Sequence, residues 1–92
     1  MVDHAANPAF KEALNRYLRF LTAERGGTNH TVKSYREDLL QLIDYLRDAG
    51  CNRPADVTTV MLRRYAAALH ATGYAPTTIA RKLASIRSFY RF

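Results

Sequence analysis

The chain has little of several residue types that mark particular classes of protein. It has one cysteine, Cys51, so no internal disulfide can form, which fits a reducing cytoplasm. Its histidines, His4, His30 and His70, are far apart and have no partners at metal-ligand spacing, so we expect no metal site. No apolar run approaches the roughly 18 residues of a membrane span, and the N-terminus lacks a signal-peptide pattern. We therefore expect a cytoplasmic chain without membrane contact.

Motifs of catalysis are also missing. The sequence contains no glycine-rich phosphate loop, no nucleophile elbow and no pair of carboxylates at catalytic spacing. We therefore expect neither catalytic residues nor a bound cofactor in these 92 residues.

The third absence is local. No Asp or Glu occurs from Val57 to Phe92, whereas acidic and basic residues balance before Val57, so the net charge of +6 belongs to the last stretch. A one-sided basic surface on a small domain is typical of a protein that binds a polyanion. The cations of this stretch are Arg63, Arg64, Arg81, Lys82, Arg87 and Arg91.

Hydrophobic periodicity predicts four helices and no strand, in one domain covering residues 1–92. Caps, prolines and glycines set the expected limits. The helices are expected from Asn7-Pro8 to Gly26-Gly27, from Thr28 or soon after to Gly50, from Thr58 to Gly73, and from near Pro76 onward. They form two helix–turn–helix pairs. Because no stop signal follows Phe92, we expect the chain to be a fragment of a longer protein.

The fourth helix is expected to bury one face and leave a polar, basic face free. We predict that its core face centres on Ile79, Leu83, Ile86 and Tyr90. The predicted free face consists of Thr77, Arg81, Ala84, Ser85 and Ser88, with Thr78 and Lys82 on its flank. Small residues allow close approach to another surface, and hydroxyls and cations donate to phosphates and base edges.

The second helix is basic only in its first turns, and its later turns carry acids that phosphate would repel. We expect any contact with DNA to involve its N-terminal end, where the helix dipole favours an anion. The candidate residues there are Thr28, His30, Thr31, Lys33 and Ser34.

Simpler roles compete for several of these residues. Thr28 and Thr31 fit helix caps, and Arg63-Arg64 fits a solvated face. Arg87 borders the predicted core face, so an internal ion pair is as good an interpretation as a ligand contact.

Two segments resemble motifs of the tyrosine recombinases, the phage integrase and Xer-type family. Residues 31–39, Thr-Val-Lys-Ser-Tyr-Arg-Glu-Asp-Leu, resemble the family pattern Thr-x-x-Ser-Tyr-x-x-Asp-Leu. Residues 78–92 resemble the closing helix of the same N-terminal domain, with its Thr-Ile-x-Arg-x-Leu pattern and later Arg-x-Phe. Where the family often has serine before this helix, the chain has Ala75-Pro76.

The resemblance implies a fold and a function. It implies an all-α, SAM-like bundle of four or five helices in two helical hairpins, the core-binding domain of a site-specific recombinase used in DNA integration or recombination. Its expected partners are double-stranded DNA, its own C-terminal catalytic domain and other recombinase subunits in a tetrameric synapse. The second and fourth helices are expected to face DNA. The second helix would use the candidates named above, and the fourth would use Thr77, Thr78, Arg81, Lys82 and Ser85. The resemblance also implies that the catalytic residues belong to the C-terminal domain, which we expect to be absent from this chain.

Two other functions remain open at this point. A helix–turn–helix regulator would need a steeply crossing recognition helix and usually a dimer interface. A SAM-like protein-interaction domain would use the basic surface for an acidic protein and have no role on DNA.

Overall fold

The computed structural model describes residues 8–24 and 29–92, which fold into four α-helices and one short 3₁₀-helix. No strand occurs in these ranges. In chain order the elements are α1 (Pro8–Glu24), α2 (Asn29–Asp48), η2 (Pro54–Asp56), α3 (Thr59–Thr72) and α4 (Pro76–Arg91). The expected all-α fold of four helices is confirmed. In addition, Pro54 begins a short helical turn in the segment that connects α2 to α3.

The ends of the helices follow from local chemistry. The Thr58 side chain caps α3 by accepting a hydrogen bond from the Met61 amide at 3.2 Å. Gly73 ends α3 with φ of 99°, a left-handed conformation that glycine adopts without strain. Ala75 precedes α4 without any side-chain cap, and Pro76 occupies the first helical position, as the sequence indicated. The Gly26-Gly27 stop lies outside the described residues.

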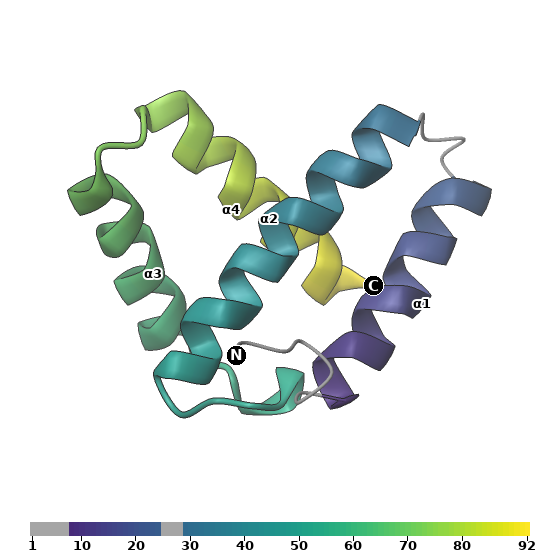
Figure 1. Ribbon diagram of the computed structural model, residues 1–92, viewed down its shortest axis with the longest axis horizontal. Coiled ribbons are helices and arrows are strands. Elements are labelled where there is room, and N and C mark those ends of the chain that lie inside the picture. The colour runs from purple at the N-terminus through teal and green to yellow at the C-terminus, as the bar shows by residue number, and fades with distance from the viewer. Residues whose placement is uncertain (1–7, 25–28) are drawn as a thin grey trace.

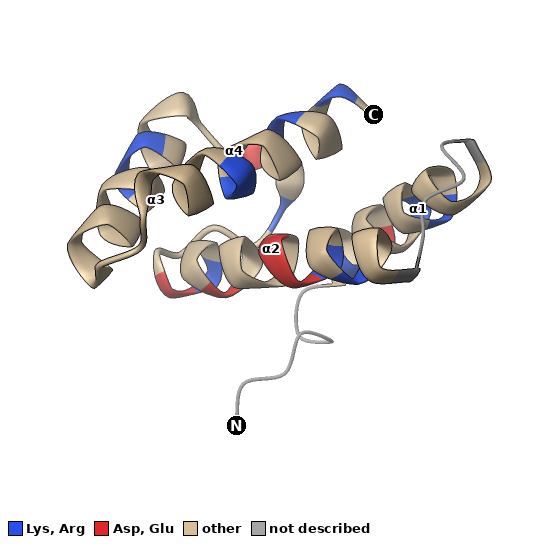
Figure 2. Ribbon diagram, turned by 90° about the horizontal axis from the view of Figure 1, so that it is seen from above, with Lys and Arg blue, Asp and Glu red and all other residues tan. Residues whose placement is uncertain are grey.

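The two helical hairpins form two layers. Seen from above, α1 and α2 occupy one layer and α3 and α4 the other, with the acidic ribbon lying mainly in the α1–α2 layer (Figure 2). The central helix, α2, packs against α1, α3 and α4, and it crosses α4 near the middle of both helices (Figure 1). The predicted arrangement of two hairpins is therefore correct, and the crossing of α2 and α4 is the main contact between them.

The hydrophobic core lies between these layers. Its most deeply buried members include Phe10 and Tyr17 of α1, Leu42 and Leu46 of α2, and Tyr65 of α3. None of the described helices is long and apolar enough to span a lipid bilayer.

Aromatic residues close the bundle where α4 ends beside α1. The Tyr17 hydroxyl donates a 2.6 Å hydrogen bond to Ser88 Oγ, and the ring of Tyr17 packs edge-on against Phe89 with centroids 5.5 Å apart. Phe92 lies over Phe20 at a centroid distance of 4.8 Å. Tyr90, expected in the core, is instead 40% exposed, and its hydroxyl donates to the carbonyl oxygen of Pro54.

Core truncation should unfold this small domain readily. Leu46 is fully buried, so Leu46→Ala is expected to lower the free energy of unfolding by about 2–5 kcal/mol. Urea denaturation followed by circular dichroism measures the change. Val60 is 52% exposed, so Val60→Ala serves as the control and should shift stability by no more than about 0.5 kcal/mol. Equal effects of the two substitutions would contradict the assigned core.

Candidate nucleic-acid interface

A buried polar network connects α2 to α4 where they cross. Asp38 of α2 is only 2% exposed, and Lys82 Nζ of α4 donates to its Oδ1 at 3.1 Å. Ser85 Oγ donates to Asp38 Oδ2 at 3.0 Å, and Arg81 NH1 lies 3.3 Å from the same oxygen. One carboxylate therefore binds three side chains of α4, because residues 81, 82 and 85 fall on adjacent turns facing α2.

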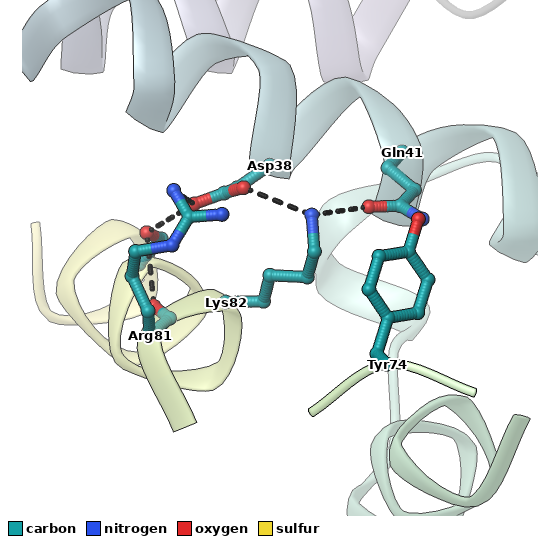
Figure 3. Close-up of polar contacts among 6 residues, drawn as sticks. Asp38, Gln41, Tyr74, Arg81 and Lys82 are labelled. Carbon is teal, nitrogen blue, oxygen red and sulfur yellow. Dashed lines mark hydrogen bonds and ion pairs between the residues drawn. The ribbon is translucent and has the colours of Figure 1, made fainter. Parts of the chain in front are cut away.

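The network extends toward the α3–α4 turn. Lys82 Nζ also donates to Gln41 Oε1 at 2.7 Å, and Gln41 Nε2 donates to the Tyr74 hydroxyl at 3.1 Å (Figure 3). The ammonium group of Lys82 lies 5.2 Å from the centre of the Tyr74 ring, within the range of a cation–π contact. We call these six residues the Asp38 network: Asp38, Gln41, Tyr74, Arg81, Lys82 and Ser85.

The predicted free face of α4 is wrong at two of the candidate DNA contacts. The Lys82 side chain is 9% exposed and Ser85 is 1% exposed, and both are bonded to Asp38. The core face is rotated toward Lys82 because α4 packs against α2 as well as α3. Neither side chain is available at the surface to touch a duplex.

The exposed side of α4 has a different composition from the one expected. It contains Arg87, which was expected near the core, and Arg91, and neither has an ion pair with any acid in the described parts of the chain. Arg81 remains half exposed, at 50%. We call this surface the basic face of α4; its exposed members are Thr77, Ala80, Arg81, Ala84, Arg87 and Arg91.

The other candidates on α4 lie in its first turn. Thr77 is exposed and Thr78 is half-buried. Their amides precede the first hydrogen bond within the helix, which runs from the Ile79 amide to the Ala75 carbonyl at 3.0 Å. Because Ala75 provides no side-chain cap, this end of the helix retains donors and positive potential for an anion.

The candidates of the second helix lie at the start of α2. His30, Thr31 and Lys33 are exposed and Ser34 is half-buried, whereas Thr28 lies outside the described residues. The starts of α2 and α4 lie along the same edge of the molecule, at the top of Figure 1. In that view α4 begins on the left and α2 on the right, and the two helices cross below (Figure 1).

Sequence reasoning missed the role of Asp38, although a signal was present. Asp38 lies three residues after Tyr35 and four before Leu42, and Lys82 lies between Ile79 and Ile86 at the same spacings. Opposite charges inserted in two apolar stripes suggest a buried pair. The buried pair was missed because both charged side chains were expected at the solvent-exposed surface.

A buried phenol lies close to the network. Tyr65 of α3 is 2% exposed, and burial, followed by the charge of Asp38 and the neighbouring Tyr74, raises the pKa of its hydroxyl above the ordinary value. Partial burial, followed by the neighbouring Cys51, raises the pKa of Tyr90 to about 12. Both hydroxyls therefore ionise less readily than that of an ordinary tyrosine.

The fold and this surface define a small all-α domain built of two crossed hairpins with a basic face that lacks acidic residues. Residues 14–92 match the family described as phage integrase, N-terminal SAM-like domain, and the chain belongs to that family. This confirms the resemblance found in the sequence. No solved structure matches the chain.

Curated relatives agree with this family. The chain is 38% identical over 80 residues to the tyrosine recombinase XerD of Brucella abortus biovar 1. The matched residues make up 87% of this chain and 26% of the relative. The chain is 33% identical over 79 residues to the tyrosine recombinase XerC of Oceanobacillus iheyensis, covering 86% and 26% of the two chains. The XerD of Bradyrhizobium diazoefficiens is 36% identical over 87 residues, covering 95% and 27%. The chain thus spans about a quarter of the length of these relatives.

Breaking the buried pair on one side should be costly. Lys82→Met leaves the carboxylate of Asp38 buried without its ammonium partner, so we expect the free energy of unfolding to fall by about 3–5 kcal/mol. Adding Asp38→Asn removes the buried charge and should recover most of this loss. Urea denaturation at neutral pH measures both variants. If the double variant is as unstable as Lys82→Met, the loss does not come from an unpaired charge.

Stability should also fall in alkali. As the pH rises above about 10, the tyrosines of the unfolded chain ionise before Tyr90 and Tyr65 of the folded chain do, so ionisation favours unfolding. We expect the free energy of unfolding to decrease over this range. In a Tyr65→Phe, Tyr90→Phe variant the decrease should be smaller, as measured by urea denaturation at pH 8 and pH 11. An identical decrease in the variant would show that other groups cause it.

Proposed function

We propose that this domain binds double-stranded DNA and positions a tyrosine recombinase on its recombination site. The observation that carries the proposal is the basic face of α4, whose three arginines include two without an acidic partner in the described residues. Membership of the phage integrase N-terminal family supports it, and the relatives are named as tyrosine recombinases.

The chemistry of the face suits a duplex. Arginine binds phosphate or the guanine edge with paired hydrogen bonds, and the methyl groups of Ala80 and Ala84 let the helix approach closely. Thr77 adds a hydroxyl at the start of the helix. The start of α2 adds Lys33 and the positive end of a helix dipole on the same edge. Phosphate contacts of this kind set the register of a protein on DNA, while a few side chains such as Thr77 and Arg81 read bases.

The candidate DNA contacts therefore change from the set predicted from the sequence. Lys82 and Ser85 are replaced by Arg87 and Arg91, because burial removes the first two from the surface. His30, Thr31, Lys33, Ser34, Thr77, Thr78 and Arg81 remain candidates. Strand cleavage and joining are proposed for the rest of a recombinase, since this chain corresponds to about a quarter of such proteins.

One feature favours a second candidate function, docking of a protein. A groove of about 200 Å³ runs between α3 and α4, with Leu62, Leu83 and Ile86 in its lining and Arg63 and Arg87 beside them. An acidic partner with an apolar side chain would fit it, as a protein-interaction domain requires. Arg63→Ala would weaken the binding of such a protein. The proposed binding of DNA depends instead on Arg81.

Salt dependence provides the test of DNA binding. If Lys33, Arg81, Arg87 and Arg91 each neutralise one phosphate, affinity for a duplex should fall about 10²-fold between 50 and 200 mM salt. Arg81→Ala should weaken binding and reduce the slope of log affinity against log salt by about 0.9. Fluorescence anisotropy with a labelled duplex measures both quantities.

The matched control removes the same charge elsewhere. Arg47 pairs with Asp44 and Asp48 near the end of α2, so Arg47→Ala should leave the slope unchanged. A folded wild-type domain that fails to bind duplex DNA at low salt would refute the proposal. Equal losses from the two substitutions would refute the assigned face.

A further inference from the structure

Arg81 differs from the other arginines of the basic face because it is anchored. Its NH1 lies 3.3 Å from Oδ2 of Asp38, a carboxylate that is 2% exposed, while half of the Arg81 side chain remains exposed. Arg87 and Arg91 have no carboxylate within ion-pair distance in the described chain. Arg81 is thus bound on its inner side and open on its outer side.

The charge of the anchor is already balanced. Lys82 Nζ lies 3.1 Å from Oδ1 of Asp38, so the carboxylate and the ammonium form a nearly neutral buried pair. The three charged groups together carry one net positive charge, and the Arg81 side chain is the member of the cluster that is half exposed to solvent. Arg81 can therefore be oriented by Asp38 and still keep its charge for an anion outside.

Further contacts keep Lys82 on the inside. Its ammonium donates to Gln41 Oε1 at 2.7 Å and lies against the ring of Tyr74, which in turn accepts a hydrogen bond from Gln41. Figure 3 shows Lys82 pointing toward Asp38 and Gln41, with Arg81 on the opposite side of Asp38. These contacts satisfy the ammonium without any external ligand.

We propose that Asp38 and Lys82 are positioning residues that hold Arg81 as a pre-oriented, uncompensated cation for DNA; the proposal rests on the proposed function. Asp38 fixes the direction of the guanidinium, and Lys82 cancels the charge of Asp38. Neither touches DNA. Ordering a flexible side chain in advance removes a cost of roughly 0.5–1.5 kcal/mol on binding, which corresponds to an affinity gain of about two- to twelve-fold.

The ordering of Arg81 can be measured without DNA. In ¹⁵N relaxation of arginine Nε–H groups in the free protein, Arg81 should be more ordered than Arg87 and Arg91 of the same helix. The test variant is Asp38→Asn with Lys82→Met, which leaves the net charge unchanged and no buried ion unpaired. In it, the order of Arg81 should fall to that of Arg87. Tyr17→Phe, which removes a hydrogen bond at the far end of α4, controls for lost stability and should leave Arg81 ordered.

A mutant cycle then measures the effect on DNA. The double substitution should weaken duplex binding about two- to twelve-fold in the wild-type background and have no effect in the Arg81→Ala background. That coupling is the signature of residues that act through Arg81. Titrations at one fixed salt concentration on variants that melt cooperatively provide the data.

The other outcomes overturn the proposal in distinguishable ways. If the double substitution weakens binding equally with and without Arg81, then Lys82 contacts phosphate itself or the effect is a general loss of structure. If Arg81 stays ordered in the double variant, Asp38 is not its anchor. If the folded wild-type domain does not bind DNA, the proposed function fails together with any role of Arg81 on DNA, while the relaxation result still shows whether Asp38 orders Arg81.

Discussion

The register in which α2 and α4 cross is set by a carboxylate that cannot remain buried alone. Moving an ion into a protein interior costs several kcal/mol, and only a close counter-ion with additional hydrogen bonds offsets that cost. Asp38 has both, from Lys82 and Ser85, which lie 44 and 47 positions away in the chain. The carboxylate is therefore stable only when the second hairpin is placed on the first with these residues opposite it. Any sliding or rotation of α4 along α2 would leave a buried charge unpaired.

This constraint divides α4 lengthwise. Lys82 and Ser85 face α2, Ile79 and Ile86 join the hydrophobic core, and the remaining side carries Arg81, Arg87 and Arg91. The same helix thus supplies the contact that fixes its orientation and the surface that this orientation displays. Because Arg81 belongs to both sides, the geometry of the buried pair and the geometry of the basic face are coupled.

Much of the fold followed from local sequence signals, and the exact faces did not. Thr58, Gly73 and Pro76 marked their helix ends correctly because caps and turns depend on a few neighbouring residues. The face of α4 was misplaced because helical periodicity counts Lys82 as solvent-exposed, and only a partner on another helix makes its burial acceptable. The sequence correctly predicted that Thr77 and Arg81 are exposed. Arg87 was expected near the core, but it is exposed as well. Side-chain burial is decided by packing between segments that the sequence does not place relative to one another.

An apolar pair at positions 38 and 82 could hold the two helices equally well, since replacing a buried ion pair by hydrophobic residues is often neutral or stabilising. Two observations indicate what such a pair would lose. Hydrophobic contacts tolerate small shifts, whereas the hydrogen bonds of Asp38 to Lys82 and Ser85, at 3.1 and 3.0 Å, require one register. An apolar side chain would also offer nothing to the guanidinium of Arg81, which lies 3.3 Å from the carboxylate. The ion pair therefore constrains the register of the two helices and provides an anchor for Arg81, and an apolar pair of equal stability would do neither.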